Sequence, residues 1–224
     1  MKIINLRETK FLVRSDADIA VCKEIFTNKN YEKPRLGFSV KEGEVWLDCG
    51  ANIGVFSVWA EKKKGAIVYG FEACEENTQI AQHNLQLNGC ESKVFTGFVK
   101  SVGEGKTKVG FNEKTPARSS AFHGSSARGV PNICLNDLIA KYKPNGIKID
   151  IEGGEFDLLD KGINLEGVSS VVLEYHFRFD KNCIPARKRI EPLMKKFKHH
   201  SVPKCVFDLD QWMGWQDAIF YFWD

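Results

Sequence analysis

The chain has 224 residues, of which 43% are hydrophobic, and a formal net charge of +3. This length predicts one domain over residues 1–224, with enough apolar side chains for a sheet that is covered on both faces. No apolar run approaches the ~20 residues of a membrane span, and the small net charge gives no indication of a nucleic-acid partner.

The seven cysteines are odd in number and form no C-x-x-C pair. This pattern favours a reducing compartment and argues against a zinc cluster. The first residues also lack the apolar core of a signal peptide. We therefore expect a cytoplasmic protein.

Residues 1–44 precede the regular part of the sequence pattern. Lys2–Leu6 and Lys10–Arg14 are predicted to form a hairpin. The next helix is predicted to begin after Ser15, a good N-terminal cap, and to end at Phe26. Asn28–Arg35 is polar and predicts a loop.

From Val45 onward, strands and helices alternate, which predicts a doubly wound, mostly parallel sheet. The predicted strands are Val45–Asp48, Ile67–Glu72, Lys93–Val99, Ile147–Ile151, Val171–Phe177 and an antiparallel closing pair, Val202–Phe207 and Ala218–Trp223. The predicted helices are Ile53–Lys63, Glu75–Asn88, Asn136–Tyr142, Phe156–Lys161 and Pro185–Lys198. Lys106–Phe111 alternates like an edge strand, and Glu113–Val130 predicts a long loop that is either a functional lid or a disordered segment.

A turn of small residues follows the first core strand. That strand ends at Asp48, and the turn contains Gly50, Ala51, Asn52 and Gly54. A strand that enters a helix through such a turn opens a crevice at its carboxyl end, where glycines allow a ligand to approach the backbone. The spacing differs from the G-x-G-x-x-G of dinucleotide sites. The preceding acid suits a positively charged ligand such as S-adenosylmethionine better than a phosphate.

Two other strand ends carry acids. Glu72 ends the second core strand, where a carboxylate can accept hydrogen bonds from both ribose hydroxyls of an adenosine group; a solvated glutamate is the alternative. Asp150, Glu152 and Glu155 surround the Gly153-Gly154 pair after a later strand. These acids should face the glycine turn at the switch point of the sheet. Some of them are expected to cap a helix, and others to contact substrate or cofactor.

The last signal is a histidine beside an acid. Glu174 and His176 are two residues apart in a predicted strand, so both side chains can point at one pocket. We expect His176 or Asp150 to act as the general base for an alcohol, with Glu174 orienting the histidine. A structural histidine is the alternative. Asp150, Glu152, Glu174 and His176 can also hold a divalent cation, an interpretation that we favour less.

In these motifs the chain resembles the FkbM family of S-adenosylmethionine-dependent methyltransferases. The matching pieces are LDCGANIGVFS, FEACEEN, LNDLI, IKIDIEGGE and LLDKG leading to VVLEYH, which follow the family's order over roughly 45–177. The resemblance implies a seven-stranded Rossmann-like sheet with an antiparallel last strand and a catalytic core over 45–224. It also implies O-methylation of a hydroxyl, most often on a sugar or glycan. Methylation of another small molecule, a protein or a nucleic acid, or cofactor binding without catalysis, are the alternatives.

The resemblance also assigns residues. It implies that S-adenosylmethionine is held by Asp48, Gly50, Ala51, Asn52, Gly54, Glu72, Ala73, Val99, Lys100, Ser101 and Asp150. It places Asp150, Glu152 and His176 toward the acceptor. Ala73 replaces the family's usual proline, and Asn136 replaces an acid. Residues 1–44 and Glu113–Val130 match nothing in the family pattern, so we expect them to set acceptor specificity, with hydrogen bonds to sugar hydroxyls from Arg118, Ser120 and His123.

Overall fold

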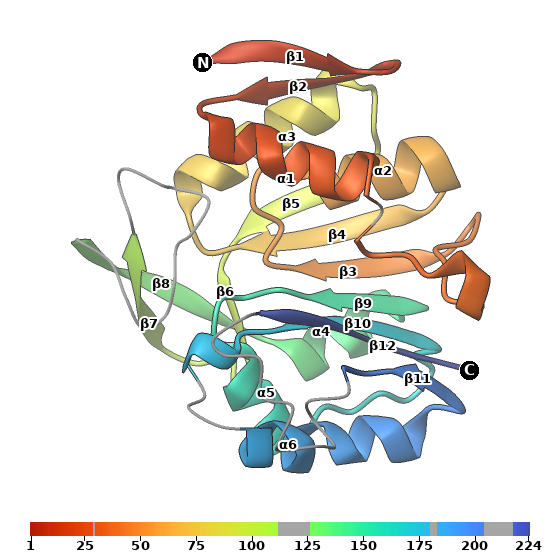
Figure 1. The fold of residues 1–224 in the computed structure, drawn as a ribbon. Coiled ribbons are helices and arrows are strands. Elements are labelled where there is room, and N and C mark those ends of the chain that lie inside the picture. The colour runs from red at the N-terminus through yellow and green to blue at the C-terminus, as the bar shows by residue number, and fades with distance from the viewer. Residues whose placement is uncertain (29, 112–125, 180–182, 204–216) are drawn as a thin grey trace.

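The structure is a computed structural model that describes residues 1–28, 30–111, 126–179, 183–203 and 217–224. Its centre is a seven-stranded sheet in the order β11-β12-β10-β9-β3-β4-β5 (Figure 1). The strands are β3 (Val45–Cys49), β4 (Ile67–Glu72), β5 (Lys93–Thr96), β9 (Gly146–Ile149), β10 (Ser170–Tyr175), β11 (His199–Ser201) and β12 (Ala218–Trp223). Strands β5, β4, β3, β9 and β10 are parallel, and β12 is antiparallel to both of its neighbours. The predicted doubly wound sheet with an antiparallel last strand is therefore confirmed.

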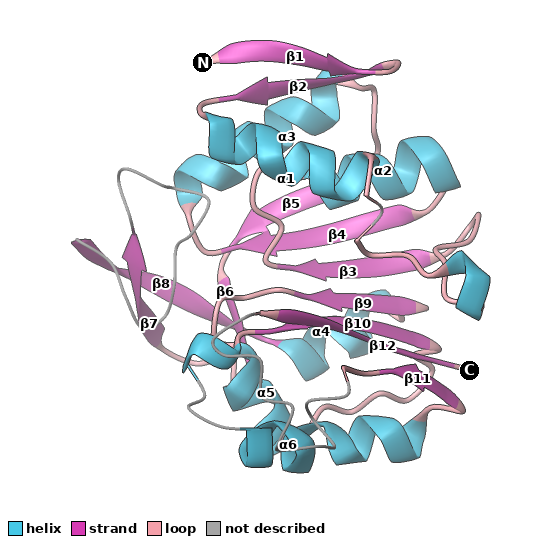
Figure 2. Cartoon of the chain, viewed as in Figure 1, coloured by secondary structure: helices cyan, strands magenta, loops and turns pink. Residues whose placement is uncertain are grey.

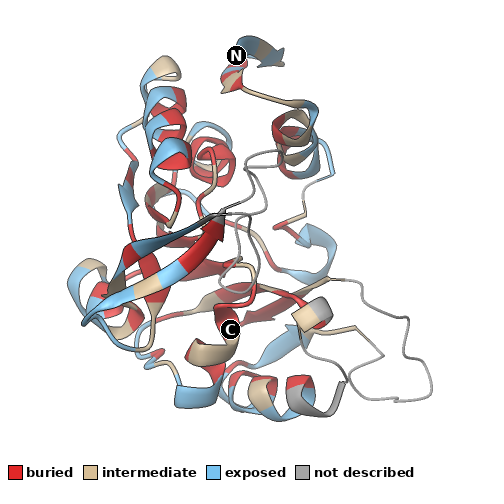
Figure 3. Ribbon diagram, turned by 90° about the vertical axis from the view of Figure 1, so that its left-hand side faces the viewer, coloured by how far each residue is buried: buried red, intermediate tan, exposed pale blue. Residues whose placement is uncertain are grey.

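Helices cover both faces of this sheet (Figure 2). One hydrophobic core includes residues of α1 (Asp16–Phe26), α2 (Val55–Lys64) and α3 (Glu75–Leu87), and the other includes residues of α4 (Leu135–Tyr142), α5 (Glu155–Lys161) and α6 (Cys183–Lys196). Successive strand residues alternate between the two cores, as Trp46 and Leu47 do. Figure 3 shows the buried residues concentrated in the central strands and on the helix faces next to them. Among the described helices, none has the length and apolar character to cross a membrane.

The N-terminal hairpin is hydrogen-bonded to the end of α3. Strands β1 (Lys2–Leu6) and β2 (Thr9–Val13) pair antiparallel, as predicted. Asn84 Oδ1 accepts the Leu12 N–H at 2.7 Å, and the Asn88 amide exchanges two hydrogen bonds with the Lys10 backbone at 3.0 and 2.7 Å. Ser15 caps α1 as predicted, because its hydroxyl accepts the Asp18 N–H at 3.4 Å. The 3₁₀ helix η1 (Pro34–Leu36) lies in the following loop.

The predicted strand Lys93–Val99 is in fact two strands in two sheets. After β5, the chain leaves the main sheet, and β6 (Phe98–Lys100) joins a small sheet with β7 (Lys106–Phe111) and β8 (Ser126–Cys134). Gly97 stands at the junction, where a Cβ would lie 2.1 Å from the Ile133 side chain. A glycine therefore permits the chain to change sheets at this point.

Two further predictions need correction. Residues 126–130 were expected in a loop, but they form the first part of β8 and pair antiparallel with β7. This strand was not predicted because residues 126–130 show no clear hydrophobic period. It forms through backbone hydrogen bonds to β7. The sixth strand of the main sheet is β11 (His199–Ser201), which precedes the predicted Val202–Phe207. The rest of the expected loop, 113–125, lies outside the described residues, as do 204–207.

Candidate active site

The turns after β3 and β9 touch each other at the carboxyl edge of the sheet. A Cβ on Gly50 would lie 1.7 Å from the Asp150 carbonyl oxygen, and the φ of Gly50 is +88°. The Asp150 N–H donates to the Cys49 carbonyl at 2.9 Å. Close contact between two backbone segments thus requires a glycine at position 50. This contact brings the acids that follow β9 against the glycine turn, as expected.

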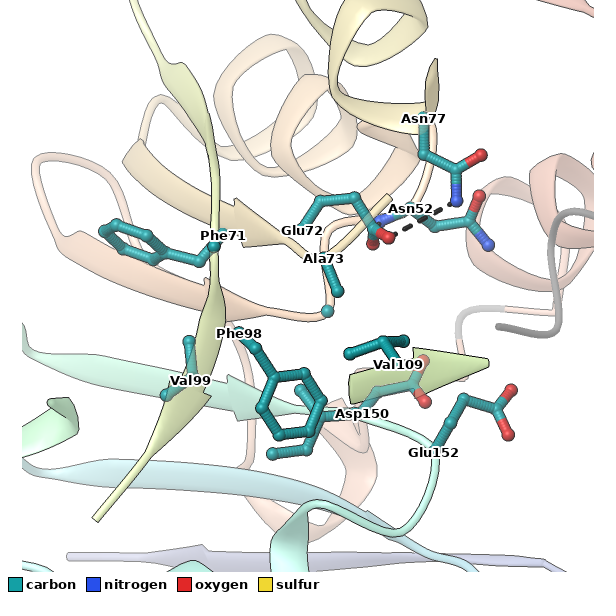
Figure 4. Close-up of a pocket in the computed structure, with 13 residues that line it drawn as sticks. Asn52, Phe71, Glu72, Ala73, Asn77, Phe98, Val99, Val109, Asp150 and Glu152 are labelled. Carbon is teal, nitrogen blue, oxygen red and sulfur yellow. Dashed lines mark hydrogen bonds between the residues drawn. The ribbon is translucent and has the colours of Figure 1, made fainter. Parts of the chain in front are cut away.

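Glu72 is buried at the end of β4, and three N–H donors hold its carboxylate. The Asn52 N–H donates to Oε2 at 2.8 Å, and Asn77 Nδ2 donates to Oε1 at 3.4 Å (Figure 4). The Cys74 N–H also donates to Oε1, at 2.8 Å. Burial raises the pKa of Glu72, and these hydrogen bonds oppose that shift. Asn52 adopts a φ of +49° to place its N–H here. The carboxylate has a fixed orientation that fits a vicinal diol such as that of ribose.

A narrow pocket begins at Glu72 and ends at Asp150 and Glu152 (Figure 4). Its other walls are largely apolar and come from Phe71, Ala73, Phe98, Val99 and Val109. Such walls suit a flat heterocycle such as adenine. Of Val99, Lys100 and Ser101, which were expected to contact the cofactor, Val99 alone lines the pocket. Phe98 and Val109 were missed because β7 meets β6 only through tertiary pairing with β8.

Lys100 and Ser101 contact α5 and are not among the lining residues of this pocket. The Ser101 N–H and hydroxyl donate to Asp157 Oδ2 at 2.9 and 2.7 Å, and Lys100 Nζ lies 3.9 Å from Asp157 Oδ1. Both residues therefore anchor the end of β6. Their expected contact with the cofactor stays a prediction, although neither residue lines this pocket.

A second cavity of about 370 Å³ adjoins the narrow pocket. Both are lined by Gly50, Asn52, Asp150 and Glu152. The additional walls come from α1, Asn30 and Tyr31, from the ends of β9 and β10, and from Asp217. The volume falls in the range of ~300–1,000 Å³ that is common for small-molecule sites. Residues of α1 together with Asn30 and Tyr31, all within residues 1–44, thus line this cavity; that this extension sets acceptor specificity stays a prediction.

Asp48 lies beneath the turn and not in the wall of either cavity. It is fully buried, with the Ser57 hydroxyl donating to Oδ2 at 3.0 Å and Lys148 Nζ at 2.9 Å from Oδ1. Lys148 also donates to the Gly50 carbonyl at 2.9 Å. Burial disfavours the charged Lys148, but Asp48 and Asp150 raise its pKa above the ordinary value. Asp48 therefore supports the turn through Lys148 and lines neither cavity, so its expected contact with the cofactor stays a prediction.

His176 is fixed by Glu155, not by Glu174 as expected. Glu155 is fully buried and accepts the His176 backbone N–H at 3.0 Å, with its Oε1 2.9 Å from Nδ1 of the ring. The other ring nitrogen, Nε2, lies 3.5 Å from Glu152 and 3.7 Å from Asp150. Burial disfavours the imidazolium, but Glu155, Asp150 and Glu152 together raise the pKa of His176 to about 10. The ring is therefore a cation at neutral pH.

Three ionisable residues converge at the ends of β9 and β10. Asp150, Glu174 and His176 each offer a possible metal ligand, and these atoms lie within 4.8 Å of one another. Burial and the charge of Asp150 raise the pKa of Glu174 to about 8. The Tyr31 hydroxyl lies 3.0 Å from Asp150 and 3.2 Å from Glu174. Tyr31 was not singled out in the sequence, where it is an isolated aromatic residue in a polar loop.

The expected acceptor contacts Arg118, Ser120 and His123 lie outside the described residues. Ala51 lines the second cavity and Glu152 lines both cavities; their expected roles at the cofactor and at the acceptor stay predictions. Gly54 supports the turn from below, since a Cβ there would lie 3.0 Å from Ala81. The described part of the site therefore joins a diol-binding carboxylate to a cluster of titratable groups. This arrangement fits the ribose and the positively charged sulfonium and ammonium of S-adenosylmethionine.

Comparison with known proteins agrees with this geometry. Residues 48–212 match the family model described as the methyltransferase FkbM domain. The chain is 28% identical over 195 residues to methyltransferase SdnD of Sordaria araneosa, covering 69% of this chain and 73% of that protein. It is 27% identical over 148 residues to the hexuronic acid methyltransferase AglP of Haloferax volcanii, covering 62% of this chain and 59% of that protein.

Among solved structures, that of M. jannaschii TYW2 in complex with AdoMet has a TM-score of 0.49 and 15% identity, and the match covers 98% of this chain and 83% of that one. The family match extends over most of the core, including the glycine turn, Glu72 and the acids after β9. The chain therefore belongs to the FkbM family of methyltransferases, whose methyl donor is S-adenosylmethionine.

Proposed function

We propose that this protein is an O-methyltransferase that methylates a hydroxyl of a sugar or glycan. The observation that carries this proposal is the junction of two cavities at Gly50, Asn52, Asp150 and Glu152. The pocket of Glu72 is suited to adenosine, and the adjoining cavity presents carboxylates that can accept a proton from a hydroxyl. The similarity to a hexuronic acid methyltransferase supports a sugar as the acceptor.

The proposed mechanism assigns Asp150 as the general base. S-adenosylmethionine supplies a methyl group whose carbon–sulfur bond breaks with both electrons going to sulfur. Asp150 is partly exposed to the cavity, and Lys148 Nζ lies 3.6 Å from its Oδ2. His176 has a pKa of about 10 and so holds its proton at neutral pH. Its Nε2–H can therefore donate to the acceptor oxygen or to Asp150, but does not take the proton.

The test is methyl transfer from a deuterium-labelled cofactor to a panel of neutral, amino and uronic acid sugars, read by mass spectrometry. We expect a labelled product on a hydroxyl oxygen, identified by fragmentation. A panel that includes a peptide, an RNA and a small phenol decides between acceptor classes. Label that appears only on one of these, or on a carboxylate or nitrogen, would contradict the proposal.

Metal dependence is tested separately. Asp150, Glu174 and His176 can present ligand atoms to a divalent cation, but Lys148 and the imidazolium already supply positive charge there. We therefore expect turnover to remain within about twofold after treatment with a chelator. A loss of tenfold or more that added magnesium reverses would assign the carboxylates to a metal and not to proton transfer.

A further inference from the structure

Helix α6 and the residues that follow it present a basic stripe on the surface of the protein. Residues 187–198 contain six lysines and arginines and a single acid, whereas the whole chain has a net charge of only +3. The exposed basic residues, which we call the α6 stripe, are Arg187, Lys188, Lys195, Lys196 and Lys198. The single acid, Glu191, lies with Oε1 2.7 Å from Lys195 Nζ. Among the described residues, the stripe therefore carries an excess of positive charge.

An apolar groove adjoins this stripe. It is a cavity of about 360 Å³ that is lined by α6, by the end of α5 and by the loop after α5. Its apolar walls are Leu159, Ile163, Leu165, Pro192 and Leu193. Lys196 lines the groove and also belongs to the α6 stripe, while Glu166 is the single acid in the lining. A ligand in the groove would therefore meet apolar walls with a lysine beside them.

The two cations of the groove differ in their contacts. Arg189 donates to the Asp160 carboxylate at 2.7 and 3.1 Å and to the Tyr175 hydroxyl at 3.0 Å, so it holds α6 against α5 and β10. Lys196 Nζ lies 5.3 Å from the centroid of the Phe197 ring, and among the described residues it forms no ion pair. Lys196 is therefore the cation that can meet an anionic group at the groove.

The stripe and the groove together indicate a ligand with an anionic part and an apolar part. A free anion would use the stripe and leave the apolar walls without a contact. Single-stranded nucleic acids stack their bases on aromatic side chains beside a basic surface, but here Phe197 is buried and Trp223 is covered by the stacked His199. An anionic phospholipid offers both parts, because its headgroup attracts lysine and arginine while its chains contact apolar side chains.

We propose that the α6 stripe and its groove form a peripheral membrane-binding surface. The stripe binds the headgroups of a bilayer that contains anionic phospholipids, and one lipid chain enters the groove beside Lys196. Part of this attachment is electrostatic, so it weakens as the salt concentration rises. The inference is independent of the proposed function, because the α6 stripe lines neither cavity of the active site.

The first experiment measures binding of the full chain to vesicles by sedimentation. We expect binding to phosphatidylcholine vesicles that contain phosphatidylglycerol, and none to phosphatidylcholine alone. Lys195→Glu/Lys196→Glu should bind at least ~10-fold more weakly, because each basic residue near an anionic surface adds to the attraction. Lys188→Glu/Lys198→Glu reverses two other charges of the stripe and should show a similar loss. Failure of the wild type to bind the anionic vesicles overturns the inference.

The matched control is Lys62→Glu/Lys63→Glu on α2. It makes the same charge change at two exposed positions, on a helix that packs against the other face of the sheet. Its affinity for the vesicles should stay within about twofold of the wild type, because charges far from the bilayer are screened. Circular dichroism and the melting temperature show that each variant is folded. Equal losses in the control and in the stripe variants would mean that net charge alone drives binding, which also overturns the inference.

The second experiment tests the groove by methyl NMR. Soluble dihexanoyl phosphatidylglycerol should shift the methyl signals of Ile163, Leu165 and Leu193. Glycerophosphoglycerol, which is the same headgroup without chains, should leave these signals unchanged. If the lipid moves none of them, or if the headgroup alone moves them equally, no chain enters the groove and the inference is wrong.

A nucleic acid is the competing partner for the stripe. Single-stranded RNA that binds the wild type and not the stripe variants, without any binding to anionic vesicles, would assign the stripe to nucleic acid and overturn the inference. Methyl transfer to a soluble acceptor should be unchanged in both stripe variants. Loss of vesicle binding and loss of methyl transfer are thus measured separately, and failure of this inference leaves the proposed function untouched.

Discussion

At the scale of single residues, buried acids have different functions although the sequence presents them alike. Glu72 presents its carboxylate to the narrow pocket, whereas the Asp48 carboxylate is paired with Lys148 and accepts a hydrogen bond from Ser57. The Glu155 carboxylate contacts the His176 ring with Oε1 and accepts the Gly153 N–H with Oε2. These acids differ in which hydrogen-bond donors and cations lie next to them. Those partners are brought together by contacts between the turns that follow different strands.

The first residue-scale prediction concerns the cofactor. Glu72→Ala removes the carboxylate that is proposed to accept hydrogen bonds from the ribose hydroxyls. It also removes the acceptor of the Asn52 and Cys74 N–H groups. We expect S-adenosylmethionine to bind ~10- to 100-fold more weakly, since hydrogen bonds to a charged group contribute about 1.5–3 kcal/mol. Isothermal calorimetry measures this change, with Glu76→Ala, an exposed acid on α3, as control. Equal affinity for wild type and Glu72→Ala would remove Glu72 from the site.

The second residue-scale prediction concerns the Glu155–His176 pair. In Glu155→Gln the buried carboxylate is lost, so the pKa of His176 should fall from about 10 toward its ordinary value of 6.5. We expect kcat to drop by ~10²-fold. NMR titration of the imidazole and steady-state kinetics measure the two effects. The control is Asp160→Asn, which changes an exposed acid on the same helix that pairs with Arg189, and it should change neither quantity. An unchanged His176 titration would refute the pairing.

At the scale of elements, the site depends on the contact of the turns after β3 and β9. Gly50 has both a positive φ of +88° and a Cβ position 1.7 Å from the Asp150 carbonyl oxygen. Gly89, after α3, has a positive φ of +62° with nothing within 4 Å of its Cβ position. Comparing alanine substitutions at the two glycines therefore distinguishes the effect of backbone strain from that of a steric clash between the turns.

We accordingly predict that Gly50→Ala displaces the turn after β9 and weakens both cofactor binding and turnover by at least ~10-fold. Gly89→Ala should carry only the strain of its φ, about 1 kcal/mol in the free energy of unfolding, with cofactor affinity unchanged. Urea unfolding and calorimetry on both variants measure these quantities. Equal effects on affinity would mean that contact between the turns is not what shapes the pocket.

At the scale of the whole molecule, the site lowers stability at alkaline pH. The pKa of Glu174 is raised from 4.5 to about 8, and that of His176 from 6.5 to about 10. The folded state thus binds more protons than the unfolded state over this range. The stability from each group is complete below its ordinary pKa and is lost as pH rises through the folded pKa.

We therefore predict that the melting temperature of the cofactor-free protein falls by several degrees between pH 6 and 10, because ~1 kcal/mol shifts it by about 2–4 °C in a chain of this size. Glu174→Gln should flatten the part of this decline that lies below about pH 8, where the folded protein holds a proton on Glu174 that the unfolded chain has lost. Scanning fluorimetry at constant ionic strength measures the curves. A melting temperature that rises from pH 6 to 10 in the wild type would contradict the assigned shifts.

The sequence by itself determined the strand–helix order, the glycine turn, Glu72 and the acids after β9, because these follow from local periodicity and from short motifs. Tertiary structure alone decided the rest. At Gly97 the chain leaves the main sheet for a second one, and Asp48 is paired with buried Lys148. His176 contacts Glu155 where Glu174 was expected, and the Tyr31 hydroxyl contacts Asp150 in the site. Each of these depends on contacts between residues far apart in the chain. Local periodicity fixes which face a residue occupies but not which distant donor or acid meets it there.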